Sequence, residues 1–153
     1  MDEFSSHLNE LLVDTFRNIL KVEEEMLRSS ETLNLSISEM HLIESVGKSK
    51  DEGRNISSIA EDLNITLPSV TVAINKLRTK GYVEKLRGET DNRTVIVKLT
   101  KSGRRVDAVH RYFHENMVRN VTREMTDEEK QALVKGVIKL NSFFKGKIKP
   151  AEA

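Results

Sequence analysis

Apolar residues recur with the period of an α-helix along residues 56–77, interrupted once. The first apolar stripe consists of Ile56, Ile59, Ala60 and Leu63. A short break at residues 64–66 follows. A second stripe then repeats at positions i, i+3, i+4 and i+7, at Val70, Ala73, Ile74 and Leu77. Such spacing places apolar side chains on one face of a helix, so the pattern predicts two consecutive amphipathic helices.

The residues around the second helix predict where it begins and ends. Pro68 lies in its first turn, where a missing backbone N–H costs nothing. Gly81 follows it, at a place where a left-handed cap is needed. Two β-rich runs, residues 82–87 and 93–99, are joined by the turn-forming loop 88–92. Helix, turn, helix and hairpin together predict a winged helix-turn-helix.

Longer amphipathic segments flank this unit on both sides. Apolar residues at helical spacing over residues 4–26 predict a long first helix, and Ser36 with Glu39 forms a capping box for a second. Thr100 can cap a fifth helix, and Thr126 with Glu129 forms a capping box for a sixth. We expect a single chain over 1–153, mainly α with a small β-wing. Residues 1–34 and 104–153 supply dimerisation helices around a DNA-binding region at 35–103.

The outward face of the second helix of the helix-turn-helix is expected to read DNA. Short polar side chains there can meet base edges, and Val72 offers a methyl contact to thymine. The basic residues that follow suit phosphates, whereas Asp91 can orient Arg93 for a minor groove. Without an early arginine on this face we expect an A·T-leaning site. The candidate DNA-binding residues are Pro68, Ser69, Thr71, Val72, Asn75, Lys76, Arg78, Lys80, Arg87, Asp91 and Arg93.

Charge is distributed unevenly along the 153 residues, although the net charge is only +1. Residues 1–55 carry 6 basic and 12 acidic side chains, a net of −6, whereas residues 66–105 carry 10 basic and 3 acidic, a net of +7. The second segment spans the expected recognition helix and wing, where phosphate binding requires positive charge. We expect double-stranded operator DNA as the partner, bound by a two-fold homodimer with two recognition helices.

Other classes of protein are poorly supported. The chain has no cysteine, so a disulfide framework or thiol sensor is excluded. It has no nucleophile motif or glycine-rich phosphate loop, so we expect no enzyme. It has no apolar run of membrane-spanning length, so we expect a cytoplasmic protein without a membrane partner. A winged helix that binds protein in place of DNA would not need the +7 segment.

The layout resembles the MarR family of bacterial transcription regulators across nearly the whole chain. The most specific similarities are Asp91-Asn92-Arg93 and Leu99-Thr100-Lys101-Ser102-Gly103, close to the family's wing signature. The segment 77–83 fits the usual end of the recognition helix. Where many members have arginine in the middle of that helix, this chain has Val72. The resemblance implies a winged-helix regulator that acts as a homodimeric repressor.

Within the family the chain looks most like the fatty-acid-synthesis repressors of the FabT type. The similar stretches are residues 19–28, 37–41, 47–48 and 110–118. This resemblance implies operators near fatty-acid biosynthesis genes and long-chain acyl carrier protein as corepressor. An acyl chain would need an apolar tunnel, and methionine suits a variable chain. Candidate lining residues are Phe16, Leu20, Met40, Ile43, Phe113 and Met117, whose alternative role is ordinary core.

Two histidines raise a second hypothesis for the effector. His110 and His114 are separated by one helical turn, which lets both rings meet one metal ion. Glu24 and His41 can complete the set, and the arrangement is similar to that of a zinc-sensing branch of the MarR family. The alternative is that these side chains are only hydrogen-bonded or solvated. We expect no required cofactor, with Zn²⁺, an acyl chain or another small molecule as candidate effectors.

Overall fold

The computed structural model describes residues 1–29, 33–50, 52–87 and 94–148, and the chain forms two compact units, residues 1–41 and 42–153. Within the described residues, no helix combines the length and the apolar character needed to cross a membrane. The architecture is mainly helical with one small antiparallel sheet, as the sequence predicted.

The first unit consists of helix α1, Glu3–Ser29, and the beginning of helix α2, Ile37–Gly47. The predicted capping box at the start of α2 is confirmed. The Ser36 N–H donates to Glu39 Oε2 over 2.9 Å, and the Glu39 N–H donates to Ser36 Oγ over 3.2 Å. Each end of this box satisfies a backbone donor that the first helical turn leaves without an intrahelical acceptor.

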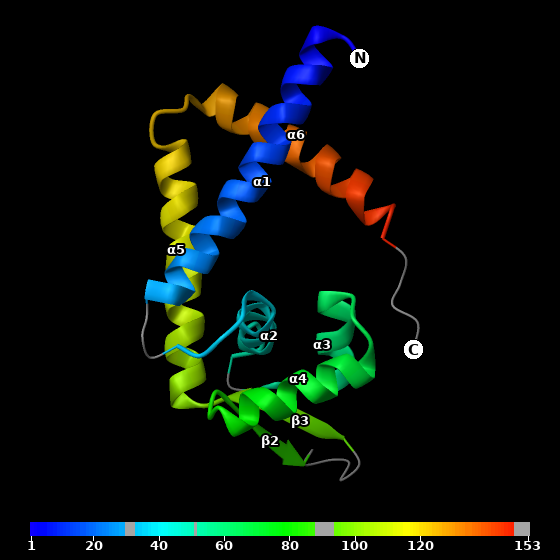
Figure 1. Cartoon of the computed structure of the whole chain (residues 1–153), viewed down its shortest axis with the longest axis vertical. Helices are drawn as coiled ribbons and strands as arrows, with labels where there is room; N and C mark the ends of the chain where they lie inside the picture. Colours follow the sequence, from blue (N-terminus) through cyan, green and yellow to red (C-terminus); the bar gives the residue numbers. More distant parts are fainter. Residues whose placement is uncertain (30–32, 51, 88–93, 149–153) are drawn as a thin grey trace. The chain divides into compact units, whose positions relative to one another are not determined.

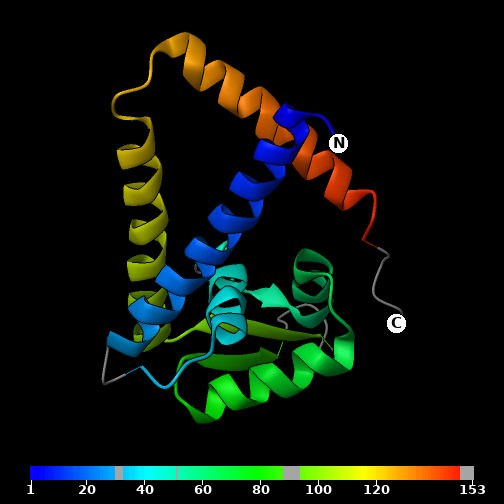
Figure 2. The same ribbon diagram turned by 45° about the horizontal axis from the view of Figure 1, so that its top comes forward.

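The second unit contains the helix-turn-helix and its wing. Helix α3 spans Ile56–Leu63 and helix α4 spans Leu67–Thr79. Strands β2, Val83–Arg87, and β3, Val95–Leu99, form the predicted hairpin, with Lys85 opposite Val97. Helix α4 lies along this sheet and α3 packs beside it (Figures 1 and 2).

A short strand, β1 at Arg54–Asn55, was not predicted. It pairs antiparallel with β3 and gives the sheet the order β1-β3-β2. Two residues are too few to show a period of two, so the hydrophobic pattern could not reveal it. Its consequence is that the wing is tied to the segment that enters α3, because Asn55 caps that helix by accepting the Ser58 N–H over 2.7 Å.

The core of the second unit is built from the apolar stripes that the sequence predicted. The side chains that α4 buries are Val70, Ile74 and Leu77. They share the interior with residues of α2, α3 and the sheet, namely Ile43, Val46, Ile59, Val83, Val97 and Leu99. Because this face of α4 packs into the core, the opposite face of the helix points to solvent.

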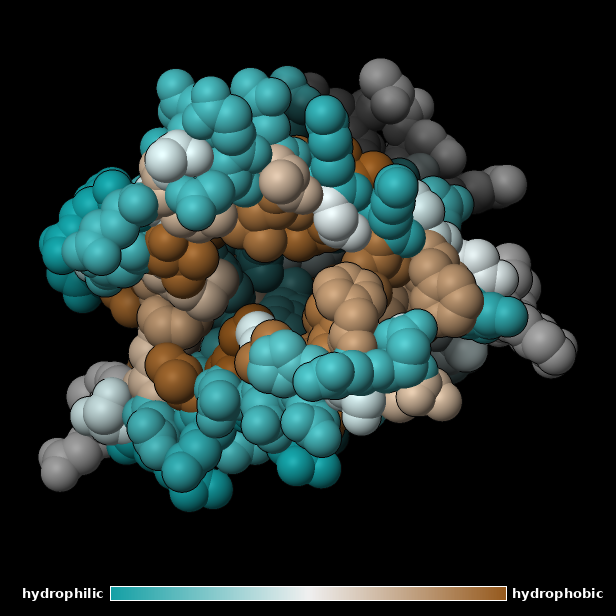
Figure 3. All heavy atoms as spheres, turned by 90° about the horizontal axis from the view of Figure 1, so that it is seen from above, coloured by the Kyte–Doolittle hydropathy of each residue, from teal (hydrophilic) through white to brown (hydrophobic). Residues whose placement is uncertain are grey.

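Helices α5, Lys101–Thr122, and α6, Asp127–Lys145, complete the chain. Both predicted caps are confirmed: Thr100 accepts the Gly103 N–H, and Thr126 and Glu129 form a capping box. Helix α6 has no buried residue. Its exposed apolar side chains are Leu133, Val134, Val137, Ile138, Phe143 and Phe144. Figure 3 shows apolar side chains gathered on an exposed face of the molecule among hydrophilic ones.

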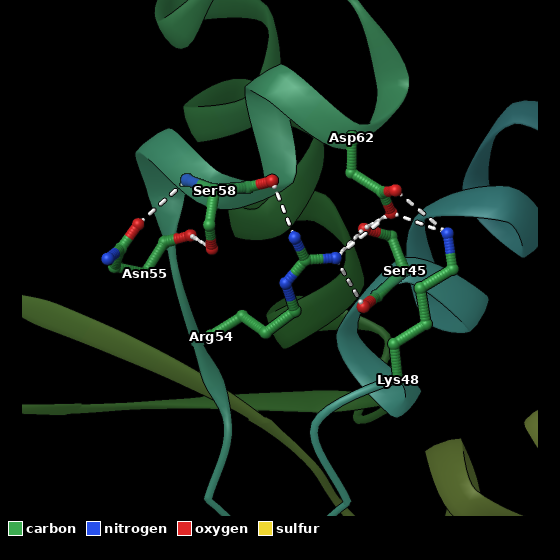
Figure 4. A network of polar contacts seen from close by, with 6 residues as sticks. All are labelled: Ser45, Lys48, Arg54, Asn55, Ser58 and Asp62. Carbon is green, nitrogen blue, oxygen red and sulfur yellow. Dashed lines mark hydrogen bonds and ion pairs between the residues drawn. The ribbon is translucent and has the colours of Figure 1, made fainter.

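A polar network fixes α3 to the end of α2 (Figure 4). The Arg54 guanidinium donates to the Ser45 carbonyl over 3.0 Å, to Asp62 over 2.9 Å and to the Ser58 carbonyl over 2.7 Å. Asp62 also accepts from Lys48 Nζ over 2.8 Å and from Ser45 Oγ over 2.7 Å. One guanidinium thus joins α2, β1 and α3.

Acidification is expected to weaken this network. Partial burial alone would raise the pKa of Asp62, but hydrogen bonds from Lys48, Ser45 and Arg54 outweigh it and lower the pKa from 3.8 to about 2. A lowered pKa stabilises the fold above about pH 4, and this contribution is lost as the pH falls towards 2. After allowance for solvent screening it amounts to about 1–2 kcal/mol.

The measurement is urea unfolding of the wild type and Asp62→Asn at pH 6 and near pH 2. The difference in unfolding free energy between the two proteins should shrink at the lower pH. A difference that stays constant would show that Asp62 does not titrate in this way.

Candidate nucleic-acid interface

The outward face of α4 carries the residues predicted to read DNA. Pro68, Ser69, Thr71, Val72 and Asn75 are all exposed, as are the basic residues that follow. Val72 is an apolar side chain left 56% exposed among polar ones. Such a surface offers hydrogen-bonding groups together with a methyl contact, the combination that a major groove accepts.

Both ends of α4 are fixed by local interactions. Asn64 adopts the left-handed conformation at φ 50° and ends α3, and Thr66 caps α4 by accepting the Ser69 N–H over 3.3 Å. At the other end Gly81 has φ 82°, the conformation that the sequence predicted for it. These two turns set the direction of α4.

The wing is joined to α5 by a compact junction. Thr100 donates from its hydroxyl to the Gly81 carbonyl over 2.6 Å and from its N–H to the Tyr82 carbonyl over 3.0 Å. Gly103 packs directly on that carbonyl, so a Cβ at this position would overlap the Tyr82 oxygen. The junction therefore requires glycine for its close approach, not for its backbone conformation.

Basic side chains border the outward face of α4. Lys76 and Arg78 lie in its last turn, Lys80 follows, and Arg87 ends β2. All four are exposed, as phosphate contacts require. The remaining predicted wing contacts, Asp91 and Arg93, lie outside the described residues, so their role stays a prediction.

One polar contact on this surface was missed by the sequence analysis. Lys85 Nζ donates to Asn75 Oδ1 over 2.6 Å, which connects β2 to the DNA-reading face of α4. The alternation of inward and outward side chains along β2 could have indicated this contact. Lys85 is two residues from the buried Val83 and therefore shares its face of the strand, where an ammonium needs a partner.

A cavity of about 230 Å³ lies between α2 and α5. The residues that line it are Glu44, Gly47, Lys48, Asp107, Arg111, His114 and Glu115. Burial raises the pKa of the Asp107 carboxyl, although the Arg111 guanidinium 3.3 Å away opposes the shift. A Cβ on Gly47 would lie 2.8 Å from this carboxyl group. None of the six predicted acyl-tunnel residues lines this cavity.

Those six residues have different environments. Met40 and Ile43 are buried, at 2% and 0% exposure, whereas Phe16 is 65% exposed. Leu20, Phe113 and Met117 are half-buried. Burial to this degree is what ordinary core residues show, and exposure such as that of Phe16 does not enclose a ligand within this chain. The acyl tunnel remains a prediction.

Two of the predicted metal ligands belong to each compact unit. On α5, His110 Nε2 and His114 Nε2 lie 3.1 Å apart, with the rings edge to face. His110 is 1% exposed, and its Nδ1 lies 3.6 Å from Glu44, a neighbour that the sequence analysis missed. On α1 the carboxylate beside His41 belongs to the residue before Glu24, and the role of Glu24 as a ligand stays a prediction. Glu24 is exposed, whereas the buried Glu23 lies 3.9 Å from His41.

Comparison with known protein families gives matches to transcriptional regulators over the part of the chain that contains the helix-turn-helix and the wing. The family model described as "Transcriptional regulator SarA/Rot" matches residues 27–108. The uncharacterized HTH-type transcriptional regulator YhjH of Bacillus subtilis is 30% identical over 81 residues, which cover 53% of this chain and 45% of that protein. YfiV of the same organism is 29% identical over 83 residues, 54% of this chain and 51% of that protein. The chain thus matches about half the length of these relatives.

Solved structures extend the similarity to almost the whole chain. FabT of Streptococcus pneumoniae, solved in complex with DNA, is 37% identical, with a TM-score of 0.87 over 94% of this chain and 99% of that chain. A mutant MarR of E. coli complexed with operator DNA is 22% identical, with a TM-score of 0.66 over 92% of this chain and 99% of that chain. The second similarity is one of fold alone.

Proposed function

The chain belongs to the MarR-type winged-helix transcriptional regulators, and from this membership we propose that it is a repressor that binds double-stranded operator DNA. The observation that carries the proposal is the outward face of α4, bordered by exposed basic residues, in a chain 37% identical to a FabT solved on DNA. The protein is a regulator and not an enzyme.

The acting form in this proposal is a homodimer. Helix α6 buries none of its residues in the single chain and exposes six large apolar side chains. Exposed apolar side chains in this number on one helix are typical of protein interfaces. A two-fold dimer would present two copies of α4 to half-sites one helical turn apart.

The regulated genes in this proposal are those of fatty-acid biosynthesis, with long-chain acyl carrier protein as corepressor. The support is the similarity to FabT over 94% of the chain, since the sequence resembles fatty-acid-synthesis repressors of that type. Such a corepressor acts by binding the DNA-competent dimer more tightly than the free one, which raises operator affinity by linkage.

The test is fluorescence anisotropy with a labelled promoter fragment from upstream of a type II fatty-acid synthesis gene. Long-chain acyl carrier protein should tighten binding at least tenfold, a coupling of about 1.4 kcal/mol. Unacylated carrier protein is the matched control and should have no effect. Equal affinity for the promoter and a scrambled duplex would refute specific binding to this promoter. Tightening by both the acylated and the unacylated carrier protein would show that the acyl chain is not the signal.

A second candidate function is zinc-responsive repression of metal-uptake genes, favoured by the pair His110 and His114. Two imidazole nitrogens bound to one tetrahedral Zn²⁺ at about 2.0–2.1 Å lie roughly 3.3 Å apart. The two Nε2 atoms lie 3.1 Å apart. Zinc bound there would replace the contact between the two rings with a shared ligand bond and so fix one turn of α5.

The same titrations distinguish the two effectors when they are repeated with chelator and with zinc. A response to zinc alone, abolished in His114→Ala and retained in His7→Ala, would favour the metal. His7 is a suitable control because it is an exposed histidine on α1. A response to the acylated carrier in chelator would leave His110 and His114 as structural residues.

A further inference from the structure

We propose that Lys85 is a positioning residue that makes Asn75 read hydrogen-bond acceptors, guanine O6 and N7 above all, and not adenine. The contact behind it is the 2.6 Å hydrogen bond from Lys85 Nζ to Asn75 Oδ1. The inference rests on the DNA-binding function proposed above and deepens it, because it assigns a base preference to one position of the operator.

The two residues are held in place by different elements. Asn75 lies on the exposed face of α4, between the fully buried Ile74 and the exposed Lys76. Lys85 is half-buried on β2, on the strand face of Val83, which is 2% exposed. The stem of Lys85 therefore rests beside the core while its ammonium reaches α4. Neither side chain has to be ordered by DNA for the contact to form.

The hydrogen bond changes what the Asn75 amide offers to a base. An asparagine that reads adenine must accept a hydrogen bond at Oδ1 from N6 and donate from Nδ2 to N7. Here Oδ1 accepts a charge-assisted bond from Lys85, and an ammonium beside it disfavours a second donor at the same oxygen. The amide NH₂, with two donors, is the group left for the base. Guanine presents two adjacent acceptors to it, O6 and N7.

Neighbouring hydroxyls on α4 do not supply equivalent donors. Thr71 donates its hydroxyl to the Leu67 carbonyl over 2.9 Å, and Thr79 donates to the Asn75 carbonyl over 3.1 Å. Both protons are used within the helix itself. The amide of Asn75 is therefore a neutral donor on this face that no hydrogen bond within the helix uses. This refines the A·T-leaning expectation at one position.

The experiment selects duplexes from a pool with a randomised core of about 20 base pairs, long enough for two half-sites. The full chain is used, as wild type, Asn75→Ala, Lys85→Met, Lys85→Arg and Lys80→Met. Each protein is then titrated against the selected wild-type duplex and its single-base-pair substitutions. The position whose preference disappears in Asn75→Ala is the one that Asn75 reads.

At that position the wild type should prefer guanine to adenine about tenfold, within the range expected for a specific base contact. Lys85→Met, which keeps most of the stem but removes the ammonium, should abolish or reverse this preference and leave the other positions unchanged. Lys85→Arg retains a donor and should restore most of it. Lys80→Met should weaken binding to all duplexes by a similar factor, as loss of a phosphate contact does.

Three results would overturn the proposal. One is a wild-type preference for adenine at the position that Asn75 reads. Another is a uniform loss of affinity in Lys85→Met, which would make Lys85 a phosphate contact. The third is an unchanged preference in a Lys85→Met protein whose circular dichroism matches the wild type. Failure of the wild type to retain any duplex would instead refute the DNA-binding function, and this inference with it.

Discussion

Gly103→Ala is expected to lower the free energy of unfolding by about 3 kcal/mol or more. The added Cβ would overlap the carbonyl oxygen of Tyr82, and Leu99 Cδ2 would lie 3.2 Å away. A backbone carbonyl cannot rotate aside as a flexible side chain can, so the junction between wing and α5 must shift. The same carbonyl accepts the Thr100 N–H, which couples the shift to the cap of α5. Urea unfolding followed by circular dichroism measures the change.

The matched control is Gly146→Ala at the end of α6. Gly146 has φ −70°, and an added Cβ would meet only ordinary contacts at 3.5 Å. The unfolding free energy should therefore change by no more than about 0.5 kcal/mol. If both variants lost the same stability, the close approach at Gly103 would not be the cause.

Arg54→Ala is expected to lower the free energy of unfolding by about 3 kcal/mol. Only 15% of the Arg54 side chain is exposed, and its removal takes the donor away from Asp62 and from the carbonyls of Ser45 and Ser58. Asp62 keeps its bonds from Lys48 and Ser45, but all three acceptors lose a charged donor in a partly buried site, and hydrogen bonds to charged groups contribute more than neutral ones. Arg54→Lys should give an intermediate loss, because one ammonium cannot reproduce the planar fork that reaches all three partners.

Arg17→Ala is the control for this variant. The ion pair between Arg17 and Asp14 spans 4.0 Å, and both side chains are more than 70% exposed. Pairs of this kind contribute little, so unfolding should be almost unchanged. An Arg54→Ala protein as stable as Arg17→Ala would show that the network of Figure 4 does not hold α3 in place.

The elements of the fold were predictable because their signals are local. The stripe that includes Val70 and Leu77, the capping boxes at Ser36 and Thr126, and the glycine at position 81 each act within a few residues of the chain. Helix periods and caps depend only on residues that are close together in the chain, so they can be recognised from the sequence directly. The same holds for the DNA-reading face of α4, which is simply the side opposite its apolar stripe.

The contacts that position this face were not predictable in the same way. The bond from Lys85 to Asn75 joins residues ten apart, and Ser45 and Asp62, which both accept from Arg54, are seventeen apart. Each depends on how separate elements pack, which no period encodes. The contact between Glu23 and His41 is of the same kind. The pattern predicted a helix over this segment, but not that Glu23 would be the buried carboxylate beside His41.

Helix α5 is a long, straight element that is joined directly to the wing at its first turn. Its 22 residues span about 33 Å, and the Thr100 bonds to Gly81 and Tyr82 clamp its first turn. A tilt of about 6° at one end of such a rod displaces the other by about 3.5 Å, close to the spacing of one base-pair step. A rotation of α5 by this small angle about its far end would therefore move the wing out of register with a groove.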